Sequence, residues 1–188
     1  YQLFIQSTDA TFYEEQFETN LYQARKLIEE IYGDDEKLYF CSLSSKTIVY
    51  KGLMLPNAIK EFYLDLKSPS FRSSICVFHQ RFSTNTHPRW HLAQPFRLLA
   101  HNGEINAIRG NRNWVKARSS KFKSPRIPKI QNFKELVNEK GSDSSALDNM
   151  IEILINGGVK LFRAIRMVMP PAWPVSYTHL RAHETYDH

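Results

Sequence analysis

Short apolar runs of strand length alternate along this chain with longer stretches of helical period. The short runs are alternating or wholly apolar, as half-buried or buried strands are. They occupy residues 1–6, 39–43, 47–51, 74–78 and 97–101. The longer stretches place apolar side chains every three or four residues, and they occupy residues 8–32, 55–66, 105–118, 144–155 and 160–169. The pattern predicts a mixed α/β (α+β) fold, with residues 39–43 and 47–51 pairing as a hairpin.

The chain carries only two cysteines, and both lie inside apolar runs. Cys41 and Cys76 are therefore expected to behave as small hydrophobic residues rather than as a disulfide framework. No run of about 18 apolar residues and no charged-then-apolar leader is visible in the sequence, so no membrane contact is expected. These features indicate a reducing compartment: the cytoplasm, or alternatively an organelle such as a plastid.

The charge is segregated along the chain. The formal net charge is +6, yet acidic residues outnumber basic ones in residues 14–36, and no acidic residue lies between Glu104 and Glu135. A basic run, Arg109 to Lys134, fills that second interval and includes aromatic residues, which keeps a nucleic-acid-binding module as an alternative function. Such runs are more often solvated surface or a docking face. Steep salt dependence of binding would separate the two readings.

Two polar segments directly follow predicted strands: HQRFSTNT at residues 79–86 and HNGEIN at residues 101–106. Strand ends that face loops are common places for sites. Arg81 offers a planar fork of donors to a carboxylate, and Asn102-Gly103 offers a side-chain amide and an unobstructed backbone N–H to an oxyanion. The structural alternatives are a structural ion pair for Arg81 and a tight turn at Asn102-Gly103. His79 is expected to be a structural hydrogen-bonding residue.

A third polar segment, GSDS at residues 141–144, begins a predicted helix. Asp143 there is suited either to capping the helix or to holding the ammonium group of a ligand. Taken alone, capping is the simpler role.

Metal and nucleotide sites are not indicated. The histidines at 79, 87, 91 and 101 show no ligand spacing beyond the His87/His91 pair, and the cysteines are not grouped. The glycines form neither G-x-G-x-x-G nor G-x-x-x-x-G-K. No cofactor is therefore expected within this chain.

Taken together, the ordered motifs resemble glutamate synthases. They are HQRFSTNT (79–86), W-x-L-A-x-P-F-R (90–97), AHNGEIN-x-x-RGN (100–111) and GSDS (141–144), with YKGLMLP (50–56) and MVMPPAW (167–173) in support. Pro171 stands where that family's pattern has an acidic residue. The resemblance covers residues 1–173 and concerns the glutaminase domain, a class II glutamine amidotransferase. Residues 174–188 have no clear period and are expected to be a non-native tail.

The resemblance implies a fold and a set of roles. The fold would be part of a four-layer α/β/β/α sandwich, that of the N-terminal-nucleophile hydrolases. Arg81 would bind the α-carboxylate of L-glutamine and Asp143 its α-ammonium group. Asn102 and Gly103 would form the oxyanion hole, and Thr84 would contact the substrate through its hydroxyl.

The resemblance also implies a nucleophile that this sequence lacks. Such enzymes use an N-terminal cysteine, whereas the first residue here is Tyr1 and neither cysteine is terminal. The chain is therefore expected to be a partial domain, inactive alone, with its nucleophile upstream. A non-catalytic relative that keeps the fold is the other alternative.

Further parts of a full-length parent are implied as well. The parent would use FMN and an iron–sulfur cluster and would transfer ammonia to 2-oxoglutarate. Its partners would be L-glutamine, the remaining domains, and a small reductase subunit or ferredoxin, with no nucleic acid and no membrane.

Overall fold

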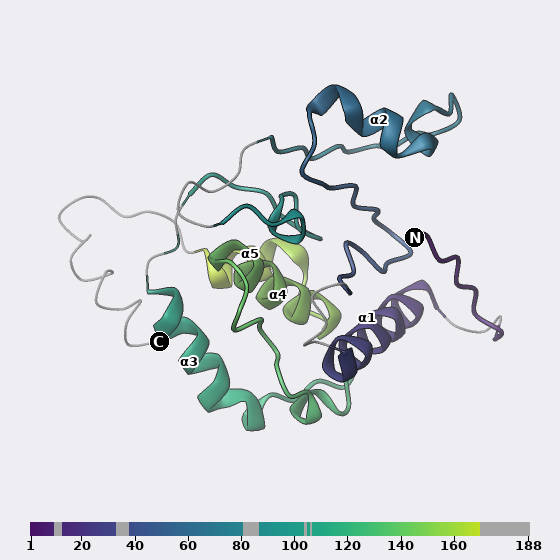
Figure 1. The fold of residues 1–188 in the computed structure, drawn as a ribbon. Coiled ribbons are helices and arrows are strands. Elements are labelled where there is room, and N and C mark those ends of the chain that lie inside the picture. Colours follow the sequence, from purple (N-terminus) through teal and green to yellow (C-terminus); the bar gives the residue numbers. More distant parts are fainter. Residues whose placement is uncertain (10–12, 33–37, 81–86, 104, 106, 170–188) are drawn as a thin grey trace.

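The computed structural model describes residues 1–9, 13–32, 38–80, 87–103, 105 and 107–169. Its α-helices are α1 (Glu14–Tyr32), α2 (Ile59–Phe62), α3 (Ile108–Arg118), α4 (Asp143–Asn156) and α5 (Leu161–Val168) (Figure 1). Short 3-10 turns lie at Pro56–Ala58, Leu64–Lys67, Trp90–Leu92, Ser119–Lys121 and Ile130–Asn132. No helix in this part of the chain is long and apolar enough to cross a membrane.

The long helices form where the sequence predicts them, with shifted ends. The first begins at Glu14 rather than residue 8, and two glutamates in its first turn favour the positive end of the helix dipole. Asp9 lies before this helix, and its backbone N–H donates to Ser7 Oγ at 3.1 Å. Helix α3 begins at Ile108 instead of residue 105, after Ala107 in the left-handed conformation (φ 57°). Residues 10–12 lie outside the described part.

Helix α4 matches its prediction closely because both of its ends are encoded locally. Ser142 is the N-cap, and its side chain accepts a hydrogen bond from Ser145 N–H at 3.1 Å. The helix ends before Gly157 and Gly158, and Gly158 has φ +99°, which disfavours side chains with a Cβ. Helix α5 then packs back on α4, with Ala164 fully buried.

The main core lies between α1, α4 and the segment 127–137. Buried apolar side chains from all three meet there: Tyr22, Ile127, Ile130, Phe133, Leu136, Val137, Ala146 and Ile153. Tyr22 of α1 contacts Phe133 edge to face, with ring centroids 6.3 Å apart. Residues 127–134 belong to the basic run Arg109 to Lys134, and their part in the core shows that this run is not only solvated surface. Its apolar residues have no regular period, so no helix or strand pattern in the sequence indicated that they would be buried.

The predicted strands are not observed. Among the described residues no strand is assigned, and segments 1–6, 39–43, 47–51, 74–78 and 97–101 have irregular backbone. A strand exists only when a neighbouring strand supplies its hydrogen bonds, and in segments 47–51 and 97–101 a side chain makes such a bond instead. Val49 N–H donates to Ser42 Oγ at 3.1 Å across the predicted hairpin. The apolar residues of segments 1–6 and 74–78 remain exposed.

The acidic and basic segments of the sequence meet in space. Arg126 pairs with Glu15 of α1 at 2.8 Å, and the backbone N–H of Lys134 donates to Glu30 at 3.3 Å. The segment after α3 thus runs beside α1 (Figure 1). Part of the basic run serves an intramolecular interface, which favours the structural interpretation of that run over nucleic-acid binding.

Candidate functional site

Asn102 and Gly103 lie on an exposed loop that leads towards α3. The side-chain oxygen of Asn102 lies 2.8 Å from His79 Nε2. Since an amide oxygen only accepts, His79 donates through Nε2, which leaves the Asn102 NH2 group free to donate elsewhere. A Cβ added at Gly103 would meet only His101 Nδ1, at 3.5 Å. The pair therefore presents an oriented amide donor next to an accessible backbone.

Asp143 lies at the first position of α4 and reaches across to this loop. Its Oδ2 accepts from the backbone N–H of Ile105 at 3.0 Å, and its Oδ1 accepts from Ser144 N–H at 2.7 Å. Ser144 Oγ donates to the same Oδ1 at 3.2 Å. A carboxylate offers about four acceptor positions, and the described residues use three of them, so one remains for a ligand ammonium group. Asp143 is thus not the N-cap, a role that Ser142 fills.

Arg112 holds the loop before α4 against α3. Its Nη2 donates to the carbonyl oxygens of Gly141 at 2.7 Å and Ser142 at 3.0 Å. The GSDS segment is therefore fixed from two sides, by Arg112 and by the bond from Asp143 to Ile105. No local pattern indicated this role for Arg112, because its partners are backbone atoms 29 and 30 residues away.

The structure brings together three of the five residues that the sequence singled out. Asn102, Gly103 and Asp143 lie on segments joined by the bond between Ile105 and Asp143. Arg81 and Thr84 lie outside the described residues, so their roles stay predictions. A cluster of three or more metal-ligating side chains is not found in the described ranges.

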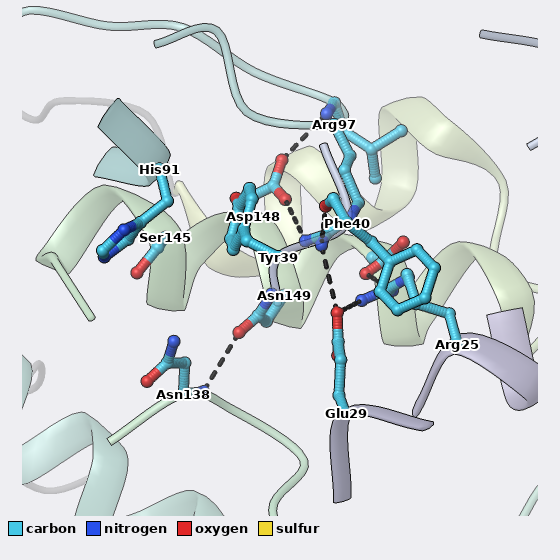
Figure 2. A network of polar contacts seen from close by, with 12 residues as sticks. Arg25, Glu29, Tyr39, Phe40, His91, Arg97, Asn138, Ser145, Asp148 and Asn149 are labelled. Carbon is cyan, nitrogen blue, oxygen red and sulfur yellow. Dashed lines mark hydrogen bonds and ion pairs between the residues drawn. The ribbon is translucent and has the colours of Figure 1, made fainter. Parts of the chain in front are cut away.

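A polar network links α1 and α4 (Figure 2). Arg97 Nη2 contacts Glu29 at 3.2 Å and the carbonyl oxygen of Phe40 at 2.6 Å. Glu29 also pairs with Arg25 at 2.7 Å, and Arg25 reaches Glu152 of α4 at 2.5 Å. The network joins α1, α4 and the segment that precedes Asn102. Its charges are segregated in sequence, which is why no local pattern indicated it.

Asp148 of α4 is the fully buried carboxyl of this region. Its Oδ1 accepts from Leu98 N–H at 2.8 Å, and its Oδ2 lies 4.0 Å from Arg97 Nη1. Oδ2 makes no hydrogen bond within the described residues. Burial, together with the nearby charge of Glu152, raises the pKa of Asp148 from 3.8 to about 6.

We expect Asp148→Asn to remove a pH dependence of stability. Because the folded-state pKa is raised, the favourable contribution of protonated Asp148 is present below pH 4 and is lost as pH rises through about 6. Urea unfolding of the full chain should show the wild type losing on the order of 3 kcal/mol relative to the variant across that window. A wild-type-to-variant difference that stays constant from pH 4 to 7 would contradict this. Glu135→Gln, at an exposed carboxylate, is the control.

Comparison with known proteins shows the family of the chain. The family model described as "Glutamine amidotransferases class-II" matches residues 1–187. "Glutamate synthase [NADH]" of Schizosaccharomyces pombe is 43% identical over 167 residues, covering 88% of this chain and 8% of the relative. "Ferredoxin-dependent glutamate synthase" of Cyanidium caldarium is 40% identical over 178 residues, covering 92% of this chain and 11% of the relative.

A bacterial relative shows the same level of similarity. "Glutamate synthase [NADPH] large chain" of Bacillus subtilis is 45% identical over 167 residues, covering 87% of this chain and 11% of the relative. The chain thus spans 8 to 11% of the length of these three relatives. The family match, and the juxtaposition of the AHNGEIN and GSDS motifs, agree with the resemblance read from the sequence. The chain belongs to the class II glutamine amidotransferase family.

Proposed function

We propose that this chain is the glutamine-binding part of the glutaminase domain of a glutamate synthase. The observation that carries the proposal is the hydrogen bond between Asp143 Oδ2 and Ile105 N–H, which holds the ammonium-binding candidate beside the Asn102-Gly103 loop. Two recognition groups that lie about 40 residues apart in sequence thereby serve one site. The family membership favours the N-terminal-nucleophile hydrolase fold, and we place the chain within its four-layer α/β/β/α sandwich.

Each recognition group has a chemical task on L-glutamine. Asp143 accepts a charged hydrogen bond from the α-ammonium group, and Arg81 binds the α-carboxylate, with Thr84 as a further hydroxyl contact. Asn102 Nδ2 and Gly103 N–H donate to the amide oxygen when it becomes an oxyanion.

The reaction proceeds through a thioester. A cysteine thiol attacks the side-chain amide carbon of glutamine, and the C–N bond breaks as ammonia leaves with the thiol proton. Water then hydrolyses the γ-glutamyl thioester to glutamate and regenerates the thiol. The ammonia is passed to 2-oxoglutarate in the parent enzyme.

Neither of the two cysteines in these 188 residues suits the role of the nucleophile. Burial raises the pKa of the Cys41 thiol, which disfavours the reactive thiolate. The backbone nitrogen of an internal cysteine is also part of a peptide bond and is not a free amine that could accept a proton. Neither cysteine carries a terminal amine, which this mechanism uses as its base.

The cofactors of the parent also lie elsewhere. An iron–sulfur cluster is held by several cysteine thiolates, and two cysteines in separate segments do not fit that requirement. The Gly-rich phosphate loops that a nucleotide cofactor often uses are also missing from the sequence. We place FMN, the cluster and the contacts to a reductase subunit or ferredoxin in the remaining domains of the parent.

A chimeric enzyme tests the proposal. Residues 1–173 would replace the aligned segment of the Bacillus subtilis large chain, and ammonia release from L-glutamine would be measured. We expect glutamine-dependent release well above that of the same chimera with its nucleophilic cysteine changed to alanine. A chimera that is folded, by protection of the α4 amides in hydrogen exchange, but releases no ammonia would overturn the proposal.

A further inference from the structure

We propose that Gln94 is a positioning residue for the oxyanion hole, an inference that rests on the proposed function of Asn102 and Gly103. The side-chain amide of Gln94 makes two hydrogen bonds to the backbone of one residue, His101. Its Nε2 donates to the carbonyl oxygen of His101 at 2.9 Å, and its Oε1 accepts from the His101 N–H at 2.8 Å. His101 directly precedes Asn102, so Gln94 fixes the backbone from which the oxyanion donors project.

This clamp does the work that a neighbouring strand would do. A residue in a β-ladder exchanges an N–H···O and an O···H–N bond with its partner, and the Gln94 amide reproduces that pair of bonds from a side chain. The chain between the two residues is closed by a further bond, from Phe96 N–H to the carbonyl oxygen of Leu99 at 2.9 Å. Residues 94–101 therefore form a closed loop whose exit is set by Gln94.

A buried lysine, Lys51, fixes the backbone just before Gln94. Lys51 Nζ donates to the carbonyl oxygens of His91 at 3.1 Å and of Ala93 at 3.0 Å. The same ammonium group lies 4.7 Å from the centre of the Phe96 ring, in the range of a cation–π contact. Lys51 is 4% exposed, and Ala93 and Phe96 on either side of Gln94 are buried. The backbone that carries Gln94 is thus anchored in the interior.

The far side of the loop is anchored as well. Asp148 Oδ1 accepts from Leu98 N–H at 2.8 Å, which ties the loop to α4, the helix that also carries Asp143. The Asn102-Gly103 donors and Asp143 are proposed to bind opposite ends of glutamine. Both are therefore positioned by the same unit, which consists of α4 and the loop 94–101 that is bonded to it. Oxyanion donors act only when they lie close to the position that the developing charge will occupy, so loss of this frame should affect turnover more than substrate binding.

Removing the clamp should lower kcat and spare KM. Gln94→Met keeps the approximate volume of the side chain and removes both hydrogen bonds. In the chimera we expect kcat for glutamine hydrolysis to fall on the order of 10-fold or more, with KM within about twofold, because misplaced donors fail mainly in the transition state. Exchange of the His101 amide hydrogen should accelerate in the same variant. Gln131→Met, at an exposed position in the 3-10 turn Ile130–Asn132, is the matched control and should change neither quantity.

A second variant carries a pH signature that a merely structural role would not produce. Gln94→Glu keeps the acceptor for His101 N–H, but a carboxylate there faces the carbonyl oxygen of His101. When protonated, the carboxyl again has one donor and one acceptor, like the amide it replaces. We expect its kcat relative to the unsubstituted chimera to rise as pH is lowered from about 8 to about 5, since repulsion and burial raise the pKa of such a carboxyl. His91, His101 and Lys51 are the neighbouring titratable residues, and dividing by the unsubstituted chimera at each pH removes the pH effects that are common to both proteins.

The outcomes separate this inference from the proposed function. Faster His101 exchange with unchanged kcat in Gln94→Met would overturn the positioning role while leaving the glutaminase assignment intact. Unchanged His101 exchange would refute the clamp itself, and a kcat ratio for Gln94→Glu that does not depend on pH would also count against it. An unsubstituted chimera that is folded but inactive would instead refute the proposed function.

Discussion

Replacing Asn102 by alanine is expected to lower kcat for glutamine hydrolysis by about 100-fold or more, which is the usual cost of removing one oxyanion donor. The contact between His79 Nε2 and Asn102 Oδ1, at 2.8 Å, orients the amide so that its NH2 group is free to donate. That donation strengthens only as negative charge develops on the substrate oxygen. We therefore expect KM for glutamine to change by no more than a few-fold. Steady-state ammonia release by the chimera gives both constants.

The matched control for this variant is Asn113→Ala, at an exposed position of α3. It removes the same amide group from an exposed position that has no proposed contact with glutamine, and its kinetic constants should stay at the unsubstituted values. A loss in Asn102→Ala that appears mainly in KM would show that Asn102 binds the ground state. Turnover within a few-fold of the unsubstituted chimera would remove Asn102 from the oxyanion hole altogether.

Replacing Asp143 by asparagine is expected to weaken glutamine binding by about 100-fold. A charge-assisted hydrogen bond in a partly buried site contributes roughly 1.5–3 kcal/mol, and loss of its partner also leaves the ligand ammonium group without compensation. The bond from Asp143 Oδ2 to Ile105 N–H places this carboxylate beside the Asn102-Gly103 loop. Glutamine affinity is measured directly by titration of a chimera whose nucleophilic cysteine is changed to alanine.

A substrate analogue separates the charge role of Asp143 from a structural one. Glutaramate carries the same side-chain amide and carboxylate as glutamine but has no α-ammonium group. Asp143→Asn should therefore leave glutaramate affinity nearly unchanged while it weakens glutamine affinity. Equal losses for both ligands would indicate that the variant disturbs the loop, and unchanged glutamine affinity would refute the assigned role. Glu135→Gln again controls for the removal of a negative charge.

Much of the helical structure could be read from local sequence. Helix α4 is defined by its Ser142 cap and by Gly157 at its end, signals that act within a few residues. The start of α3 was misplaced by three residues because Ala107 adopts the left-handed conformation, which alanine rarely does. Helix ends are therefore predictable where a side chain determines them and less so where tertiary contacts do.

The strand patterns were less informative, for a physical reason. Alternating apolar residues fit a sheet only where a partner supplies backbone hydrogen bonds and an apolar surface. Ser42 and Gln94 supply some of those hydrogen bonds from side chains here. The segment 127–137 shows the opposite error: it has no regular period, yet Ile127 is fully buried in the core.

The site itself could be predicted only as separate motifs. Asn102-Gly103 and Asp143 were identified by the chemistry of their side chains and by the order of the motifs. The contacts that hold these segments in place could not be predicted from the sequence. Gln94 and Arg112 make them to backbone atoms, which carry no sequence signature. Candidate site residues can thus be proposed from sequence, while the contacts that hold their segments together require the structure.

The most direct test of the account is a crystal structure of the chimera with L-glutamate, the product, bound. We expect the α-ammonium group of glutamate within about 3 Å of the Asp143 carboxylate and a γ-carboxyl oxygen at the same range from Asn102 Nδ2 and Gly103 N–H. That result would show Asp143 and the Asn102-Gly103 donors binding opposite ends of one ligand. Glutamate bound away from Asp143, or with its γ-carboxyl oxygens remote from Asn102 and Gly103, would contradict the central claim.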